Sequence, residues 1–371
     1  MKKTICHITT VHPERDVRIF YKECKSLAKH GFDVKLIVIN GNNFTEDGVE
    51  VIGVPCNYSG RLQRFLKAPK AAYRKALQID AAIYHFHDPE FIRFGLLLKL
   101  RGKKVIFDIH ENISKQINLK DWLPFRKLFS KLYSIIDFFT SKTFYIILAE
   151  KSYATIYNKY TKNFSIILNM PEDGLLKKHI RTNRSNLENN LFYIGGVSKE
   201  RGIFQILKAL NELQKRKVEF YFHCIGPIED KTKDEIIKDE NYKKIASKIK
   251  FYGALDINEG IKLTYDCKIG LSVLEPVENY LDSYSTKIFE YMSIGLPVIS
   301  SNFPLWKEVV EENNCGICVD PLNTEEIANA IYYLFNNPKE AHKMSKNGLQ
   351  AVNEKYNWRE EEEKLIKVYD L

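Results

Sequence analysis

A carboxylate in an apolar segment is the first feature of the chain that points to chemistry. Residues 285–304 are STKIFEYMSIGLPVISSNFP, and Glu290 is the only acidic residue among them. Ser285 and Thr286 predict the start of a helix with outward-facing N–H groups, followed by Lys287 and, one turn into the helix, Glu290. A carboxylate there can accept hydrogen bonds from two sugar hydroxyl groups, as acidic residues do with ribose in nucleotide sites. The alternative is that Glu290 only complements the helix dipole.

A glycine-rich turn predicts an anion site. The sequence YIGGVSKERGI places Gly195 and Gly196 after a strand, and Arg201 and Gly202 before an amphipathic helix. Glycines let backbone N–H groups approach a ligand, the helix start attracts an anion, and arginine pairs with phosphate. A plain turn between a strand and a helix explains this motif equally well when it is taken alone.

Histidines and acids gather at predicted strand ends in the first half of the chain. His110 ends the run VIFDIH, and His85, His87 and Asp88 lie in AAIYHFHDPE. Side chains at the carboxyl ends of parallel strands can bind sugar hydroxyl groups or move protons. These residues are therefore candidates for the site, and their position alone does not choose among them. Taken singly, such a histidine is more often a structural hydrogen-bonding residue.

Charge is unevenly divided along the 371 residues. Residues 1–180 hold 30 Lys and Arg against 17 Asp and Glu, a net charge of +13, and residues 181–371 hold 26 against 30, a net charge of −4. The first half therefore faces an acidic partner, and the candidates are nucleic acid, an anionic membrane surface and a phosphorylated substrate. Much of the excess lies in two basic stretches, 61–78 and 115–145.

The second basic stretch has the composition of a helix that lies on a membrane surface. Its six Lys and Arg are interleaved, near helical spacing, with Trp122, Phe125, Phe129, Tyr133 and Ile136. Such a helix buries its apolar face among lipid headgroups and sets its cations on phosphates. A core-facing apolar stripe with a solvated basic face is an equal alternative.

Short apolar runs rich in β-branched residues alternate with amphipathic segments of helix length, the pattern of a parallel sheet covered by helices. The pattern runs from TICHITT to SIILN and restarts at LFYIGG, with the polar segment 171–190 between as the predicted linker. The predicted fold class is α/β. It consists of two doubly wound, Rossmann-like domains, 1–170 and 191–371, facing each other across a cleft. The last helix is a candidate to pack back on the first domain.

Taken together, the motifs resemble family 4 glycosyltransferases with the GT-B fold, in the branch that builds bacterial polysaccharide and cell wall. The likeness spans nearly the whole chain, through DVRIFYK at 16–22, HDPE at 87–90, DIHE at 108–111, GLPVIS at 295–300 and FPLW at 303–306. Glu290 matches the second of two glutamates on the family's helix, and Asp282 stands where the first is expected. In the glycine turn, Gly196 stands where the family has an arginine and Arg201 where it has a lysine.

The resemblance implies that the second domain binds a nucleotide sugar, such as a UDP- or GDP-sugar, and that the first binds the acceptor. Glu290 would hold the ribose. Arg201, Lys287 and N–H groups near Gly196, Ser285 and Thr286 would hold the diphosphate, and the backbone of Gly253 to Leu255 the base. His110 matches the family's donor-facing histidine, and Asp282 the residue facing the donor sugar.

In the first domain, Asp16 and Arg18 take the place of the family's glycine-rich loop, beside diphosphate or acceptor, and His87 and Asp88 would line the cleft. The family's pattern is retention of configuration with no cofactor and no bound metal. The sequence agrees in having no D-x-D flanked by strand and turn signals.

We therefore predict a retaining hexosyltransferase that elongates a lipid-linked saccharide in surface polysaccharide biosynthesis, such as capsule or O-antigen. We expect it in the cytoplasm, peripheral at the inner face of the cytoplasmic membrane, because no apolar run reaches the roughly 18 residues of a membrane span. Two alternatives stay open, a sugar-nucleotide epimerase of the same architecture and a non-enzymatic nucleic-acid-binding protein. Nucleic acid is not an expected partner, because no recognisable binding module is present.

Overall fold

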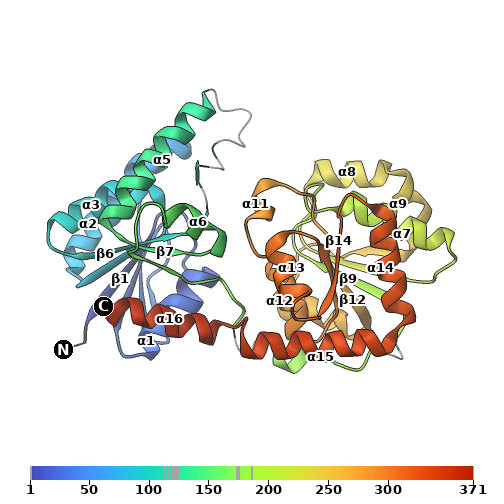
Figure 1. Cartoon of the computed structure of the whole chain (residues 1–371). Coiled ribbons are helices and arrows are strands. Elements are labelled where there is room, and N and C mark those ends of the chain that lie inside the picture. Colours follow the sequence, from blue (N-terminus) through green and yellow to red (C-terminus); the bar gives the residue numbers. More distant parts are fainter. Residues whose placement is uncertain are drawn as a thin grey trace. The chain divides into compact units, whose positions relative to one another are not determined.

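The computed structural model describes residues 2–111, 113, 114, 117, 125–172, 176–184 and 187–370. The chain divides into two compact units. Unit 1 comprises Met1–Asn169 together with Trp358–Leu371, and unit 2 comprises Met170–Asn357. Each unit is a parallel sheet between helices, as expected for a Rossmann-like domain (Figure 1).

Unit 1 is built on an eight-stranded sheet with the order β3-β4-β2-β1-β5-β6-β7-β8. All neighbouring strands are parallel except the pair β3 and β4. The central strands are buried on both faces, which explains their nearly continuous apolar sequences. The strands are β1 (Thr4–Thr9), β2 (Asp33–Ile39), β3 (Phe44–Glu46), β4 (Val49–Val54), β5 (Ile83–Phe86), β6 (Lys104–Ile109), β7 (Tyr145–Leu148) and β8 (Phe164–Ile166).

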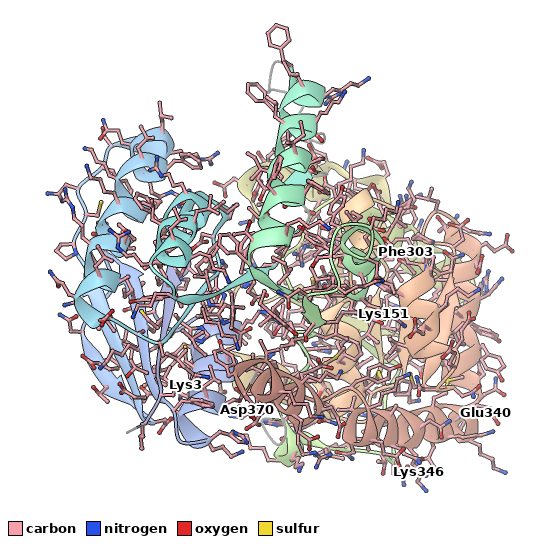
Figure 2. All side chains as sticks on the ribbon, turned by 60° about the vertical axis from the view of Figure 1, so that its left-hand side comes forward. Lys3, Lys151, Phe303, Glu340, Lys346 and Asp370 are labelled. Carbon is pink, nitrogen blue, oxygen red and sulfur yellow. The ribbon has the colours of Figure 1, made fainter. Side chains whose placement is uncertain are left out.

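The helices of unit 1 include one that comes from the far end of the sequence. Trp358, Leu365, Val368 and Tyr369 of the last helix are buried in the core that β1 and β2 share. Lys3 Nζ donates to the carbonyl of Tyr369 at 2.8 Å, and Figure 2 shows Lys3 beside Asp370. The helices are η1 (Val17–Cys24), α1 (Lys25–Lys29), α2 (Gly60–Ile79), η2 (Pro89–Phe91), α3 (Ile92–Leu100), α5 (Arg126–Thr143), η3 (Lys151–Tyr153), α6 (Ala154–Tyr157) and α16 (Trp358–Asp370).

Unit 2 is built on a six-stranded, wholly parallel sheet with the order β11-β10-β9-β12-β13-β14. Its strands are β9 (Asn190–Ile194), β10 (Tyr221–Ile225), β11 (Ile249–Phe251), β12 (Cys267–Ser272), β13 (Val298–Ser301) and β14 (Gly316–Val319). Its helices are η4 (Lys177–His179), α7 (Ile203–Lys215), α8 (Asp230–Lys238), α9 (Glu240–Ile245), η5 (Ala246–Lys248), α10 (Ile257–Lys262), η6 (Leu263–Asp266), α11 (Glu278–Leu281), α12 (Thr286–Ser293), α13 (Pro304–Val310), α14 (Thr324–Asn336) and α15 (Pro338–Glu354).

The structure differs from the sequence-based expectation in two places. The antiparallel pair β3 and β4 at the edge of the first sheet was not predicted. The described part of the expected linker 171–190 packs on unit 2: Arg184 is buried and donates to the carbonyls of Thr264, Cys267 and Gly295. A buried guanidinium needs such acceptors, so this segment is part of the domain.

The two basic stretches of the sequence form two different helices of unit 1. The first forms α2, where Arg64 Nη1 lies 2.8 Å from Glu90 Oε1 in a half-buried ion pair. The second forms α5 from Arg126 onward, and Trp122 lies outside the described residues. None of the described helices is both long and apolar enough to span a bilayer.

Candidate functional site

Unit 2 holds a cavity at the carboxyl ends of its central strands, the edge where ligands bind in sheets of this kind. Its volume is about 290 Å³. The cavity lies where β9 and β10 end and α12 begins. It is lined by Ile194, Gly195, Arg201, Ile225, Gly226, Pro227, Ala254, Leu255, Thr286, Lys287 and Glu290.

Two glycines let the backbone come close enough to form this cavity. A Cβ on Gly195 would lie 2.8 Å from Lys287 Cε and 3.3 Å from Arg201 Nη1, and φ there is +127°. A Cβ on Gly226 would lie 1.9 Å from the carbonyl oxygen of Gly195. Any side chain at either position would displace a cation or the neighbouring turn.

The cavity brings two cations together. Lys287 is buried on the first turn of α12, and its Nζ and Arg201 Nη1 each lie 3.3 Å from the position of a Cβ on Gly195. Burial, followed by the neighbouring Arg201 guanidinium, lowers the pKa of Lys287 to about 8. Two like charges close together repel each other, and the helix dipole also disfavours a cation near the N-terminus of α12. A bound anion would offset both unfavourable interactions.

The predicted donor residues fall into two groups. Glu290, Arg201, Lys287, Thr286 and Leu255 all line the cavity. The other four do not appear among its lining residues: Ser285, Gly196, Gly253 and Asp282.

The local contacts of the residues in the second group explain why most of them do not line the cavity. The Ser285 hydroxyl bonds with that of Ser272 at 3.0 Å, and the Gly253 carbonyl accepts from Gly226 N at 2.8 Å. Gly196 is adjacent to the glycine that does line the cavity. Asp282 is the C-cap residue of α11, four residues before the first residue of α12.

In unit 1, a buried ion pair positions His110. Arg18 donates to both carboxylate oxygens of Asp108, at 2.9 and 3.1 Å, and to the carbonyl of Ile167. Burial opposes ionisation of Asp108, but Arg18 outweighs it and holds the pKa of Asp108 well below its usual value. His110 Nε2 lies 3.0 Å from Asp108 Oδ2. Since an ionised carboxylate only accepts, Nε2 carries the proton of this bond and Nδ1 of neutral His110 is left as an acceptor.

Arg18 and Asp16 have structural roles in unit 1. Arg18 is buried and paired with Asp108. Asp16 caps η1 by accepting from the N–H groups of Arg18 and Ile19, both at 2.9 Å. The buried Arg18 therefore serves the fold and does not face a ligand, whereas Asp16 is partly exposed and its place beside diphosphate or acceptor stays a prediction.

His87 and Asp88 lie close to His110 through two different contacts. His87 Nδ1 is 3.2 Å from His110 Nε2, and burial lowers the pKa of His87 to about 4. Asp88 Oδ2 accepts from Thr10 N at 2.6 Å, and its Oδ1 is 3.7 Å from His12 Nε2. The ring of His12 lies 5.2 Å from that of His110. Sequence analysis missed His12, although the pattern H-P-E-R-D places an acid four residues after it.

A second cavity, of about 270 Å³, lies in unit 1 beside α5. Its lining is mostly polar and aromatic: Ile109, Ser114, Ser134, Asp137, Tyr153, Ile156, Tyr157, Lys159 and Tyr160. Burial raises the pKa of Asp137 to about 6. None of the residues proposed from sequence belongs to this set, because the serines and tyrosines that form it are not part of any motif.

Both halves of the chain match glycosyltransferase families. Residues 17–147 match the family described as Glycosyltransferase Family 4, and residues 177–351 match the family described as Glycosyl transferases group 1. The chain belongs to the family 4 glycosyltransferases. The matched segments include residues 17–22 of the motif DVRIFYK in unit 1, and Arg201, Lys287 and Glu290 in unit 2.

Similar proteins cover nearly the whole chain. An uncharacterized glycosyltransferase of Haemophilus influenzae is 24% identical over 336 residues, which is 87% of each chain. The structure of HepE from Anabaena in complex with UDP-glucose has a TM-score of 0.71 at 12% identity and covers 99% of both chains. That of WaaG, a glycosyltransferase involved in lipopolysaccharide biosynthesis, has a TM-score of 0.72 at 13% identity, covering 98% of this chain and 99% of WaaG.

These comparisons confirm the predicted family, the GT-B fold and the enzyme class of this glycosyltransferase. They favour the transferase over the epimerase and the nucleic-acid-binding protein, the two alternatives that the sequence left open.

The two cations predict a diphosphate affinity that depends on pH. The pKa of Lys287 is about 8 in the ligand-free protein, and a bound anion would raise it. Above pH 8, Lys287 must therefore take up a proton when the anion binds. Affinity for UDP or GDP should therefore fall from pH 8 to pH 10, by at most about tenfold per unit. Lys287→Ala should bind the diphosphate at least tenfold more weakly at neutral pH and lose this pH dependence. Isothermal titration calorimetry measures both.

The matched control for this prediction is Lys208→Ala, which removes an exposed lysine from α7 in the same unit. Arg201→Ala should weaken diphosphate binding as Lys287→Ala does, whereas both variants should bind the plain nucleoside nearly as the parent does. Parental diphosphate affinity in Lys287→Ala would refute the role of this lysine.

Proposed function

We propose that this glycosyltransferase moves a hexose from a nucleotide sugar to a lipid-linked saccharide at the inner face of the cytoplasmic membrane, in the synthesis of a surface polysaccharide. The observation that carries the proposal is the cavity of unit 2, where Arg201, Lys287 and Glu290 meet. Retention of configuration, with no metal ion on the diphosphate, is part of the proposal and follows the pattern of the family that the chain resembles.

The donor assignment rests on matched chemistry along the cavity. Two cations and the first N–H groups of α12 suit a diphosphate, and Glu290, one turn further along α12, suits ribose hydroxyl groups. Leu255 and Ala254 offer apolar contact for the base. HepE, a structural neighbour, is described in complex with UDP-glucose, which supports a nucleotide sugar as donor.

His110 is the residue proposed to meet the reacting sugar. Its side chain is 18% exposed, whereas those of Asp108 and His87 are fully buried. Asp108 fixes the ring, so that Nδ1 can accept a hydrogen bond from a sugar hydroxyl group. Asp282 stays in the proposal as the family's counterpart that faces the donor sugar.

The membrane assignment rests on the reversed polarity of α5. Its buried residues are Ser130, Asp137, Thr140 and Ser141, whereas its exposed ones include Leu128, Phe129, Leu132, Ile135, Ile136 and Phe139. The N-terminal end of α5 stands clear of the sheet in both views (Figures 1 and 2). A contiguous apolar surface flanked by Lys and Arg suits a lipid headgroup layer.

The polar cavity beside α5 is the proposed acceptor site. It lies against the strand that ends at Ile109, next to His110, and its serine and tyrosine hydroxyl groups suit a saccharide. A lipid-linked acceptor held there would keep its lipid near the apolar face of α5. WaaG, described as involved in lipopolysaccharide biosynthesis, supports a polysaccharide pathway.

The ribose contact is tested by Glu290→Gln, which keeps the shape of the side chain and removes its charge. UDP or GDP affinity should fall by about 1.5–3 kcal/mol, because a charged acceptor of hydroxyl hydrogen bonds is lost. In calorimetry, the parent should bind 2′-deoxy-UDP more weakly than UDP. The loss of affinity from removing the 2′-hydroxyl group and the loss from Glu290→Gln should not add, since both remove the same contact. Glu212→Gln, at a partly exposed position of α7, is the control.

Additive losses would place the ribose away from Glu290. If no nucleoside diphosphate binds the parent chain, the proposed donor class is wrong. With donor and acceptor in hand, the anomeric configuration of the product, read by nuclear magnetic resonance, tests retention.

The membrane role is tested by vesicle sedimentation. We expect the protein to bind vesicles rich in anionic lipid and to detach as salt rises, since each Lys or Arg at the surface contributes about 1 kcal/mol. Changing Leu132, Ile135 and Phe139 to Gln should lower partitioning at least tenfold. Changing Leu96, Leu97 and Leu100 to Gln, which removes exposed leucines of α3, is the matched control. Equal binding by both triple variants, or to neutral vesicles, would contradict the assignment.

A further inference from the structure

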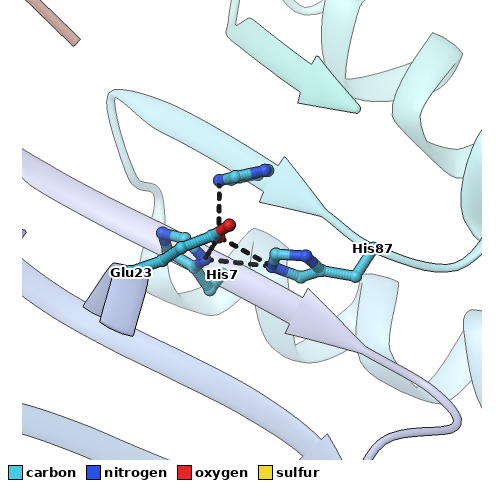
Figure 3. A group of neighbouring side chains, drawn as sticks. His7, Glu23 and His87 are labelled. Atoms are coloured by element: carbon cyan, nitrogen blue, oxygen red, sulfur yellow. Dashed lines mark hydrogen bonds and ion pairs between the residues drawn. The ribbon is translucent and has the colours of Figure 1, made fainter. Parts of the chain in front are cut away.

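Four side chains that no motif unites meet inside unit 1. They are His7 of β1, Glu23 of η1, His85 of β5 and His87, which directly follows β5. Each side chain is fully buried. Figure 3 shows the Glu23 carboxylate directed between the imidazole rings.

The spacing of their atoms is that of ligands around one ion. His7 Nδ1, His85 Nδ1 and His87 Nε2 lie 3.9, 3.8 and 4.0 Å from Glu23 Oε2. His7 Nδ1 is 3.1 Å from His87 Nε2, and all four ligand atoms lie within 4.8 Å of one another. The distances to Glu23 are too long for hydrogen bonds. Two atoms bound to one tetrahedral zinc ion at about 2.1 Å lie about 3.4 Å apart. His7 Nδ1 and His87 Nε2 would therefore move slightly apart, and the wider pairs would draw closer together.

Glu23 lacks the hydrogen bonds that a buried carboxylate needs. Neither of its oxygens has a hydrogen-bond partner, although Arg18 Nε lies 3.1 Å from Oε1 as an ion pair. Leaving such a group unsatisfied in the interior is costly. A cation among the three rings would give Oε2 a partner on the side away from Arg18.

The outer contacts of two rings suit metal ligation. His7 Nε2 is 3.1 Å from the Tyr369 hydroxyl, and His87 Nδ1 is 3.4 Å from Asp108 Oδ2. A ligating histidine usually donates its other N–H to an oxygen, which fixes the ring and its tautomer. The Tyr369 hydroxyl also lies 2.6 Å from His85 Nδ1, so a zinc ion bound at this nitrogen would replace that hydrogen bond, and Tyr369 would keep its contact with His7 Nε2.

We propose that His7, Glu23, His85 and His87 bind one zinc ion. Three neutral imidazoles and one carboxylate are a ligand set that Zn²⁺ accepts, and four buried protein ligands make a closed, structural site. The ion would tie β1, η1 and β5 together and hold His87 beside Asp108 and His110. This site is separate from the donor cavity of unit 2 and does not depend on the proposed function.

The first test uses the unaltered full-length chain. Protein produced in zinc-supplemented medium should contain about one zinc ion per chain by elemental analysis. After removal of zinc by a chelator, Co²⁺ should bind at one equivalent per chain and give the visible absorption of a four-coordinate ion. Little zinc in the purified protein together with no such absorption would overturn the proposal, and Glu23 would then be a buried acid packed among hydrogen-bonded histidines.

Single variants locate the ion. His85→Gln and Glu23→Gln should each lower the bound zinc at least tenfold. His30→Gln, at a partly exposed histidine of unit 1, and Cys318→Ser should keep it, because seven cysteines offer the other soft ligands of this chain. A folded His85→Gln variant that keeps its zinc would overturn the assignment. If the variants fail to fold, the Co²⁺ spectrum of the parent decides, since thiolate ligands give a distinct near-ultraviolet charge-transfer band that this site must lack.

Discussion

The repulsion between two cations that share one cavity is the constraint on which the site of unit 2 depends. Lys287 and Arg201 approach each other because Gly195 has no side chain to separate them. Lys287 is also buried at the start of a helix, where the dipole disfavours a positive charge. Folding alone gains little from this arrangement. Its benefit comes when an anion with two negative charges binds, which is why we regard the cavity as a diphosphate site.

In unit 1, by contrast, a buried cation is paired with a carboxylate of the protein itself. Arg18 and Asp108 form a buried pair with two hydrogen bonds, and Arg18 also satisfies a backbone carbonyl. Such a pair is compensated within the fold, so it positions its neighbours and does not call for a ligand. Its effect on function is indirect: the ionised Asp108 holds the His110 ring and sets which nitrogen faces outward. Glu23, close to the same arginine, is the exception that led to the zinc proposal.

Sequence analysis predicted the parts of the fold that depend on local patterns. Most parallel strands are short apolar runs and were recognised for that reason. The pair β3 and β4 was missed because β3 has only three residues, FTE, and Glu50 interrupts the apolar residues of β4. Glu290, Arg201 and Lys287 were found because a helix start and a glycine turn have local signatures. Sequence analysis assigned Gly196 to the diphosphate site, although Gly195 is the glycine that lines the cavity. Only the three-dimensional approach of Lys287 to Gly195 shows which of the two positions must lack a side chain. Arg18 was misplaced because burial beside Asp108, 90 residues away, leaves no local signal.

The reversed polarity of α5 was only half visible in the sequence. Its apolar and basic residues were recognised, but a stripe facing the core was an equal explanation until the exposed fractions were known. Phe139 is 63% exposed while Ser141 is fully buried, which no amphipathic pattern distinguishes by itself. The serines and tyrosines of the neighbouring cavity are common residues, and only the fold gathers them.

The measurement that tests this account most directly is a crystal structure of the chain with UDP or GDP bound. We predict that the diphosphate lies between Lys287 Nζ and the Arg201 guanidinium, within reach of the first N–H groups of α12, and that Glu290 accepts hydrogen bonds from the ribose. A nucleotide bound elsewhere, or one whose phosphates touch neither cation, would contradict the account.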